Sequence, residues 1–290
     1  MAKLQKRIIN YVAQNGTRYT FTNYLDEANG RIILDTDAPA RVVRRLTDFS
    51  DAPRKERKAI REMLVRRTTT RDGQSRQEDE SPFKGGAGLL LAGVSQCTSG
   101  YAVKTLGDHG DPFMVTAGHC FPNGAVVTTP QQNPQERRVV GTVSNRLLGL
   151  SGGLRDMELI GGKEYEGKIY VGGVNSNTTI PVVGAHDASL FARNVCYSGA
   201  ETGEACGHHV DNVLGLGCSA SGCSFPTTVF TGGERLPTEG DSGSPFYSKD
   251  GSDNATIHGH VIKVNDFVAQ AEKYSRTSAA YGVEILTHQP

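Results

Sequence analysis

Two short motifs, far apart in the chain, contain residue types that together can activate a hydroxyl nucleophile. Residues 116–120 read Thr-Ala-Gly-His-Cys, and residues 240–245 read Gly-Asp-Ser-Gly-Ser-Pro. A serine hydroxyl attacks a carbonyl group only when a base removes its proton and N–H groups receive the developing oxyanion. The first motif offers the base, His119. The second offers the nucleophile, Ser242, on a turn whose glycines permit sharp backbone conformations.

A carboxylate that orients the histidine is expected on an otherwise apolar stretch between the two motifs. Residues 154–160, Leu-Arg-Asp-Met-Glu-Leu-Ile, supply Asp156, which fits the end of a half-buried strand. Glu158 falls on the same strand face by period-two alternation and is the local competitor. Weaker candidates are Asp108, Asp111 and Asp187. We therefore expect Asp156 to complete a triad in the chain order His, Asp, Ser.

These motifs resemble those of the trypsin/chymotrypsin-like serine proteases, and the details resemble the bacterial streptogrisin and alpha-lytic protease branch. Supporting stretches are residues 96–101, 195–199, 202–207 and 278–283. The resemblance covers residues 80–290, and five separated strings recur in the family's order. It implies an all-β domain of two six-stranded antiparallel Greek-key β-barrels with a C-terminal helix. It also implies a serine endopeptidase that uses an acyl-enzyme intermediate, with the N–H groups of Gly240 and Ser242 as the oxyanion hole.

Composition agrees with this class of fold. The 290 residues include 35 glycines and no tryptophan, and short Val/Ile/Thr runs are broken by Gly, Asn and Pro, as in all-β folds with tight turns. The 31 basic and 31 acidic residues balance, so nothing global indicates a nucleic-acid or membrane partner. We expect a monomer that acts on a protein or peptide substrate, with barrels at about 86–185 and 186–290.

Residues 1–80 have a different pattern and resemble the C-terminal part of the pro-region that precedes such proteases. Residues 17–24 and 31–34 predict two strands joined at Asn29-Gly30, a strong hairpin signal. Helices are expected from residue 37, with Val42, Val43 and Leu46 on one face, and from residue 51, with Ile60, Met63 and Leu64.

The resemblance implies a zymogen whose own pro-region serves as an intramolecular inhibitor or folding aid. Residues 68–80 are polar and lack periodicity, so an exposed linker suited to processing is predicted there, with the protease domain at 81–290. A permanent regulatory or docking domain is the alternative for the first 80 residues.

Six cysteines form three sequence-local couples, although six cysteines allow 15 connectivities. The couples are Cys97–Cys120, Cys196–Cys206 and Cys218–Cys223. The first two match bridges of the bacterial family, and the third has no obvious match. Metal binding near Cys206, with His208 and His209, is the competing interpretation, but no Cys-x-x-Cys pair occurs, so we expect neither a metal nor another cofactor.

Paired thiols indicate an oxidising, extracellular location. No apolar secretory signal is visible at the start of the sequence, so a leader removed before this point is favoured.

The sequence departs from the family pattern at several places. In the family, Asp241 is buried against a cation, often an arginine after the cysteine here numbered 196, but this chain has Tyr197. Ser244 replaces a usual glycine. Residues 259–265 replace the usual Ser-Gly-Gly strand end, so the substrate pocket cannot be transferred from the family. These departures motivate the alternative that the fold is catalytically impaired and acts as a protein-binding module.

Candidate pocket residues come from two segments of the chain. They are Leu236, Pro237, Thr238, Glu239, His260, Ile262 and Lys263. No aspartate stands at the position that gives trypsins their basic preference, so a medium or large apolar residue before the cleaved bond is the default expectation. An acidic preference through His260 and Lys263 is the alternative.

Overall fold

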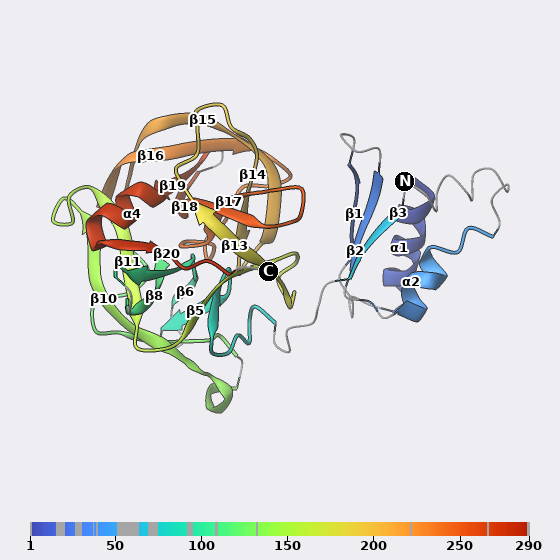
Figure 1. The fold of residues 1–290 in the computed structure, drawn as a ribbon, viewed down its shortest axis with the longest axis horizontal. Coiled ribbons are helices and arrows are strands. Elements are labelled where there is room, and N and C mark those ends of the chain that lie inside the picture. The colour runs from blue at the N-terminus through green and yellow to red at the C-terminus, as the bar shows by residue number, and fades with distance from the viewer. Residues whose placement is uncertain are drawn as a thin grey trace. The chain divides into compact units, whose positions relative to one another are not determined.

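The computed structural model divides the chain into an N-terminal unit, Met1–Arg71, and a C-terminal unit, Asp72–Pro290 (Figure 1). It describes residues 2–15, 21–26, 31–36, 38, 40–50, 64–68, 75–91, 95–107, 110–131, 133–220, 222–265 and 267–288. No helix within these ranges has the length and apolar character needed to cross a bilayer.

The N-terminal unit is a small α/β fold. Its elements are α1 (Ala2–Asn15), β1 (Phe21–Asp26), β2 (Arg31–Thr36), α2 (Ala40–Leu46) and β3 (Leu64–Thr68). Strands β1 and β2 pair antiparallel, and β3 joins β2 in parallel. Side chains from α1, β2 and α2 form one core, which includes Leu4, Leu34 and Val43.

The predicted strand pair is confirmed, and the first predicted helix is observed as α2, in which Val42, Val43 and Leu46 are buried as expected. The Asn29-Gly30 turn and residues 51–63 of the second predicted helix lie outside the described residues. Leu64, predicted at the end of that helix, instead begins β3. The sequence analysis did not predict α1.

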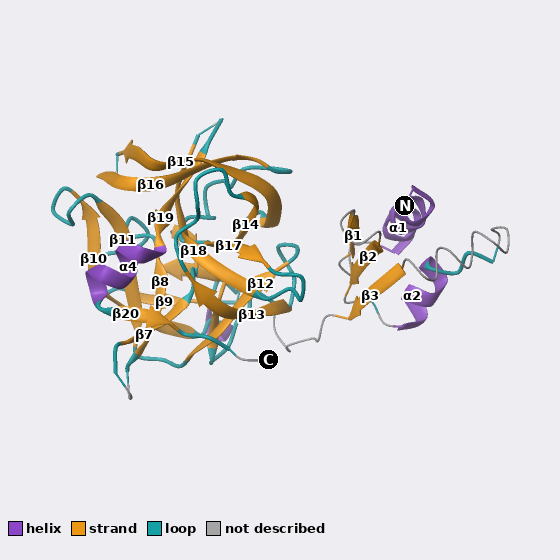
Figure 2. Ribbon diagram, turned by 45° about the horizontal axis from the view of Figure 1, so that its top comes forward, coloured by secondary structure: helices purple, strands orange, loops and turns teal. Residues whose placement is uncertain are grey.

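The C-terminal unit consists mainly of strands, which curl into two sheets (Figure 2). The first sheet has the strand order β20-β7-β8-β11-β10-β9-β5-β6. Its strands are β5 (Gly88–Leu91), β6 (Ser95–Thr98), β7 (Ala102–Thr105), β8 (Pro112–Thr116), β9 (Val126–Thr128), β10 (Val139–Gly149), β11 (Arg155–Gly161) and β20 (Val283–Ile285). A short 3-10 helix, Pro134–Glu136, lies between β9 and β10.

The second sheet has the order β17-β14-β15-β16-β19-β18-β13-β12-β4, and a further β17–β18 pairing closes six of these strands into a barrel. Its strands are β4 (Phe83–Gly85), β12 (Tyr165–Val171), β13 (Thr178–Ala185), β14 (Arg193–Gly199), β15 (Gly203–Ser219), β16 (Gly222–Gly232), β17 (Pro245–Lys249), β18 (Ala255–Val264) and β19 (Ala269–Lys273). Helix α4 (Tyr274–Tyr281) follows. The predicted fold class, two β-barrels with a C-terminal helix, is thus confirmed.

Two boundaries differ from those expected. Strands β12 and β13, assigned from the sequence to the first barrel, pair with the second sheet, because β13 lies beside β18. Part of the predicted linker is also packed into the C-terminal unit. Arg76 and Asp79 are buried there, and the main chain of Arg76 pairs with Ser176 and Gly88. The unit boundary therefore falls near residue 71, before these contacts begin.

Candidate active site

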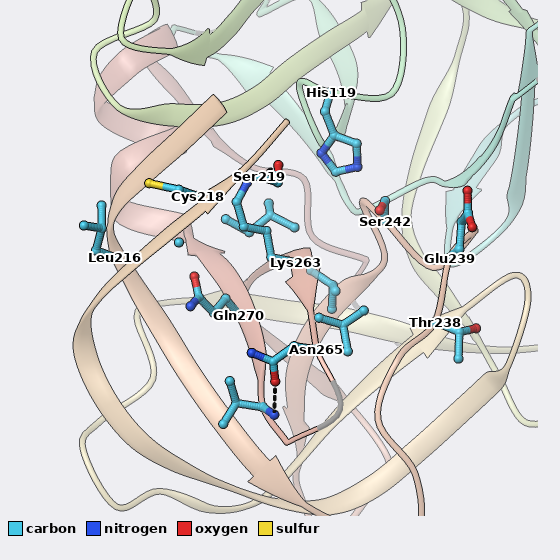
Figure 3. A pocket seen from close by; sticks show the side chains of 15 residues that line it. His119, Leu216, Cys218, Ser219, Thr238, Glu239, Ser242, Lys263, Asn265 and Gln270 are labelled. Carbon is cyan, nitrogen blue, oxygen red and sulfur yellow. Dashed lines mark hydrogen bonds between the residues drawn. The ribbon is translucent and has the colours of Figure 1, made fainter. Parts of the chain in front are cut away.

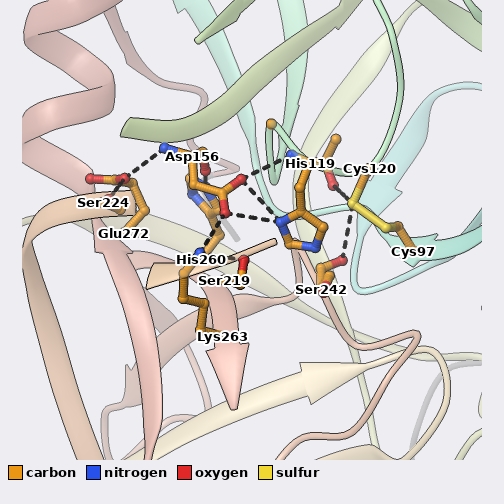
Figure 4. A network of polar contacts seen from close by, with 12 residues as sticks. Cys97, His119, Cys120, Asp156, Ser219, Ser224, Ser242, His260, Lys263 and Glu272 are labelled. Carbon is orange, nitrogen blue, oxygen red and sulfur yellow. Dashed lines mark hydrogen bonds and ion pairs between the residues drawn. A yellow bond between two sulfur atoms is a disulfide. The ribbon is translucent and has the colours of Figure 1, made fainter. Parts of the chain in front are cut away.

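His119 and Asp156 meet because the strands that carry them are neighbours. His119 lies in the turn after β8, Asp156 is the second residue of β11, and β8 pairs with β11. The His119 main-chain N–H donates to Asp156 Oδ1 at 2.9 Å, and His119 Nδ1 lies 2.9 Å from Asp156 Oδ2 (Figure 4). Because a carboxylate only accepts, Nδ1 carries the ring proton, and Nε2 is left to accept one.

The Asp156 carboxylate is 1% exposed. Burial alone would raise its pKa, but hydrogen bonds from His119 and the charges of His119 and Lys263 together lower it. Lys263 Nζ lies 3.6 Å from Asp156 Oδ2. Asp156 is therefore an anion at neutral pH, and it contacts two cationic or potentially cationic side chains.

A second layer of buried polar groups holds the main chain of Asp156. The Asp156 N–H donates to Glu272 Oε2 at 3.0 Å, and His260 Nε2 donates to the Asp156 carbonyl at 3.0 Å. Arg276 neutralises Glu272. Burial lowers the pKa of His260 to about 4, so this ring is neutral at physiological pH. His260 was a candidate for the substrate pocket; it instead lies fully buried behind Asp156, where its hydrogen bond holds the Asp156 main-chain carbonyl.

Glu158, the competitor of Asp156, does not contact the His119 ring. It is fully buried two residues further along β11, and burial together with the Asp156 charge raises its pKa to about 9. A carboxyl group that is protonated at neutral pH cannot stabilise an imidazolium as an anion. The geometry therefore favours Asp156.

The turn formed by residues 240–244 presents Ser242 beside His119. Gly240 and Gly243 have φ values of +96° and +88°, and a Cβ on Gly243 would lie 2.0 Å from Thr116 Oγ1. Both glycines are therefore needed for the conformation of the turn. Ser242 and His119 line one pocket, although within the described ranges no hydrogen bond joins their side chains. Such hydrogen bonds are often long in unliganded enzymes and shorten when substrate binds.

Of the five main-chain N–H groups of this turn, three are paired with acceptors in the described residues and two are not. Those of Asp241, Gly243 and Ser244 donate to main-chain carbonyls. Among the described residues, the N–H groups of Gly240 and Ser242 have no acceptor. Thr98, at the end of β6, fixes the same turn by donating its N–H to the Ser242 carbonyl at 2.8 Å and its hydroxyl to the Gly240 carbonyl at 2.9 Å. Two free N–H groups flank Asp241, as an oxyanion hole requires.

Neutral donors satisfy the buried Asp241 carboxylate. Oδ1 accepts from the Glu201 and Thr202 N–H groups at 3.0 and 3.1 Å, and Oδ2 accepts from the Thr202 hydroxyl at 2.8 Å and the Thr238 N–H at 2.9 Å. Tyr197, which replaces the usual arginine, hydrogen-bonds to Thr202 rather than to Asp241. A buried carboxylate with four donors is not costly in the way an unpaired one is.

The pocket beside His119 and Ser242 has a volume of about 470 Å³ (Figure 3). Four of the predicted residues line it: Thr238, Glu239, Ile262 and Lys263. Leu236, Pro237 and His260 do not. The tip of the β15–β16 hairpin, including Leu216, Cys218 and Ser219, forms another wall that the sequence analysis missed. That wall was not predicted because its position depends on the hairpin folding back toward the first barrel, where Phe225 N–H donates to the Leu154 carbonyl.

All six cysteines are in disulfides, in the three couples inferred from the sequence: Cys97–Cys120, Cys196–Cys206 and Cys218–Cys223. The third joins directly opposed residues near the tip of the β15–β16 hairpin. Cys206 is therefore not available as a thiolate ligand to a metal.

No protein-family model and no curated protein matches this sequence. Solved structures do match. Thermobifida fusca protease A is 22% identical, with a TM-score of 0.55, over 71% of this chain and 98% of its own. Cellulomonas bogoriensis chymotrypsin is 22% identical, with a TM-score of 0.54, over 71% of this chain and 98% of its own. Nocardiopsis protease is 21% identical, with a TM-score of 0.54, over 70% of this chain and 97% of its own. The chain thus has the two-barrel fold of the bacterial chymotrypsin-like serine proteases.

Proposed function

We propose that this chain is a serine endopeptidase that cleaves peptide bonds with a triad of Ser242, His119 and Asp156. One observation carries the proposal: His119 is oriented by a buried carboxylate, and its ring shares a pocket with Ser242. The fold shared with serine proteases supports the same reaction class.

In the proposed reaction, Ser242 Oγ attacks the carbonyl carbon of the scissile bond while His119 Nε2 takes the hydroxyl proton. The carbonyl oxygen becomes negative and accepts hydrogen bonds from the Gly240 and Ser242 N–H groups. Each such donor contributes about 10²–10³ in turnover. Asp156 stabilises the imidazolium, which then protonates the leaving amine as the C–N bond breaks. Water then attacks the resulting ester while His119 Nε2 takes its proton; as the ester C–O bond breaks, that proton returns to Ser242 Oγ and the carboxylic acid product leaves.

For the residue before the cleaved bond, we propose a medium or large apolar side chain. Apolar groups of Leu216, Val261 and Ile262 line the pocket. The cation Lys263 is already engaged by Asp156 and by the Ser219 hydroxyl at 3.2 Å, and Glu239 places a carboxylate on the pocket wall. An acidic substrate side chain would find the Lys263 ammonium already paired and would be repelled by the Glu239 carboxylate. A peptide-library digest with product sequencing tests this, and an acidic preference that Lys263→Met abolishes would contradict it.

We further propose that the protein is secreted, acts as a monomer on protein substrates and is made as a zymogen, with the N-terminal unit as its pro-region. Three disulfides support an oxidising compartment. The separate compact core of Met1–Arg71 supports a removable unit. Mass spectrometry of active secreted protein tests the zymogen proposal, which an intact N-terminus in the active species would contradict.

Reaction with a serine-directed fluorophosphonate tests the activity itself. We expect the processed wild type to be labelled and to hydrolyse peptides, and Ser242→Ala to do neither. Thr231→Val, a substitution on the β16 surface, is the control for handling and folding. Absence of label on folded, processed wild type would contradict the protease and support a protein-binding module instead.

A further inference from the structure

The 75–80 segment, which precedes β4, contributes two side chains to the region around Asp241. Arg76 is 0% exposed. Its guanidinium donates to the Gly199 carbonyl at 2.6 Å, to Ser198 Oγ at 3.0 Å and to the Gly172 carbonyl at 3.2 Å. Gln77 Nε2 donates to the Ala200 carbonyl at 2.7 Å. Two consecutive side chains thus hold two consecutive carbonyls, those of residues 199 and 200.

These two carbonyls begin the short turn that wraps Asp241. The next two residues, Glu201 and Thr202, give their N–H groups to Asp241 Oδ1. The approach is so close that a Cβ on Gly199 would lie 1.9 Å from that same oxygen. Asp241 in turn stands between the two free N–H groups of Gly240 and Ser242. A displacement of the 199–202 turn would therefore move the oxyanion hole.

Charge supports the same relationship. Burial lowers the pKa of Arg76 to about 10, so the guanidinium remains charged at neutral pH, and the nearby anions Glu204 and Asp241 favour that charge. The residue after Cys196 is Tyr197, which brings no positive charge to this region. Arg76 supplies a buried positive charge to the same region from a different part of the chain.

We propose that Arg76 and Gln77 are positioning residues for the oxyanion hole, and that the active enzyme therefore retains the chain from Arg76 onward. The proposal rests on the protease function argued above. It assigns a role to a stretch that the sequence alone predicted to be an exposed linker suited to processing. It also limits where maturation cleaves, because removal of Arg76 would leave buried carbonyls without donors.

The test uses full-length protein, processed as in the wild type, with the variants Arg76→Gln, Arg76→Lys and Gln77→Ala. The readout is kcat per active site, counted by fluorophosphonate titration. Displacement of an oxyanion donor costs about 10²-fold in turnover, so kcat per titrated site for Arg76→Gln should fall by about that factor, with KM nearly unchanged. Arg76→Lys should recover part of the loss, and Gln77→Ala should show a smaller one.

Arg138→Ala is the matched control. Arg138 also donates to main-chain carbonyls of this segment, those of Glu78 and Asp79, but among the described residues it makes no hydrogen bond or ion pair with the 199–202 turn. If Arg76 has only a structural role, its variants will have fewer titratable active sites but an unchanged kcat per site. That result would overturn the proposal. If the Arg76 variants do not fold, Gln77→Ala decides: unchanged kcat per site overturns the proposal.

The N-terminus of the active wild type gives an independent result. Mass spectrometry should place it at or before Arg76, and full activity in a species that begins after Arg76 would overturn the proposal. If the wild type neither labels nor turns over, the protease function itself fails and the positioning role with it. Wild-type turnover with unaffected variants removes only the positioning role.

Discussion

His119 Nδ1 and Asp156 Oδ2 lie 2.9 Å apart, and the carboxylate is almost wholly buried. Loss of the Asp156 carboxylate should therefore impair His119 as the proposed general base more than it destabilises the fold. For Asp156→Asn we expect kcat to fall by about 10⁴-fold, because an amide can stabilise the wrong ring tautomer and carries no charge for the imidazolium. The measurement is steady-state hydrolysis of a peptide substrate.

The control for that change is Asp187→Asn. Asp187 was a weaker candidate for the same role, and it instead accepts hydrogen bonds from the Ser275 N–H and hydroxyl at the start of α4. Its kcat should match that of the wild type. Equal losses in the two variants would contradict the assignment of Asp156.

Thr202→Val removes one of the donors to Asp241, the hydroxyl at 2.8 Å from Oδ2. A buried acceptor left short of a donor costs about 1–3 kcal/mol, so the free energy of unfolding should fall by that amount. We also expect a lower kcat, since Asp241 lies between Gly240 and Ser242, the two proposed oxyanion donors. Denaturant unfolding and steady-state kinetics measure the two effects.

Thr231→Val is the matched control, because Thr231 Oγ1 makes a 2.7 Å hydrogen bond to an exposed carboxylate, Asp211. It should change stability little and leave kcat unaltered. A Thr202→Val protein as active and as stable as this control would show that Asp241 does not depend on the Thr202 hydroxyl.

Stability should depend on pH through Glu158, whose pKa is raised to about 9 by burial. In the unfolded chain a glutamate has a pKa of about 4.3, so the folded state holds a proton that the unfolded state loses. This stabilising contribution is complete below about pH 4 and is lost progressively as the pH rises to about 9.

Glu158→Gln removes that dependence because glutamine does not titrate. We expect the variant and the wild type to have similar stability near pH 4. The variant should be more stable by at least about 1 kcal/mol at pH 8, since each unit of pKa difference is worth about 1.4 kcal/mol. Thermal unfolding across this range is the measurement, with Glu284→Gln as control, because the Glu284 side chain is half-exposed and pairs with Lys104 at the surface. A constant difference between variant and wild type at all pH values would contradict the buried, protonated carboxyl.

The Cys218–Cys223 disulfide closes the hairpin whose tip lines the pocket. Replacing both cysteines by serine should cost about 2 kcal/mol, because the closed loop is short. Since Cys218 and Ser219 form part of the pocket wall, KM should rise while kcat changes little. A KM unaffected by this change would mean that substrate does not reach this wall.

Removal of the Cys97–Cys120 bridge, which closes a longer loop with a sequence separation of 23, should lower the free energy of unfolding by about 3 kcal/mol.

Local sequence determined the fold class and the two ends of the proposed triad. Glycine-flanked Ser242 and His119 stand in short motifs, and alternating apolar runs specify strands without reference to the rest of the chain. The same holds for the three disulfide couples, whose members lie near one another in sequence. The sequence favoured Asp156 over its competitor Glu158, but both lie on β11, and only packing decides which one is ionised beside His119 and which is buried as an acid.

Other features depend on contacts between distant segments, which no local pattern records. The sequence around Arg76 is that of a polar linker. Its side chain is nevertheless buried, and it donates to the carbonyl of Gly199, which lies 123 residues further along the chain. His260 reads as a pocket residue, yet the pairing of β18 with β19 and the approach of β11 place it behind Asp156. Whether a side chain is buried depends on which distant segments of the chain pack against it. The sequence therefore determined the candidate reacting groups, and the tertiary structure decided which side chains hold them in place.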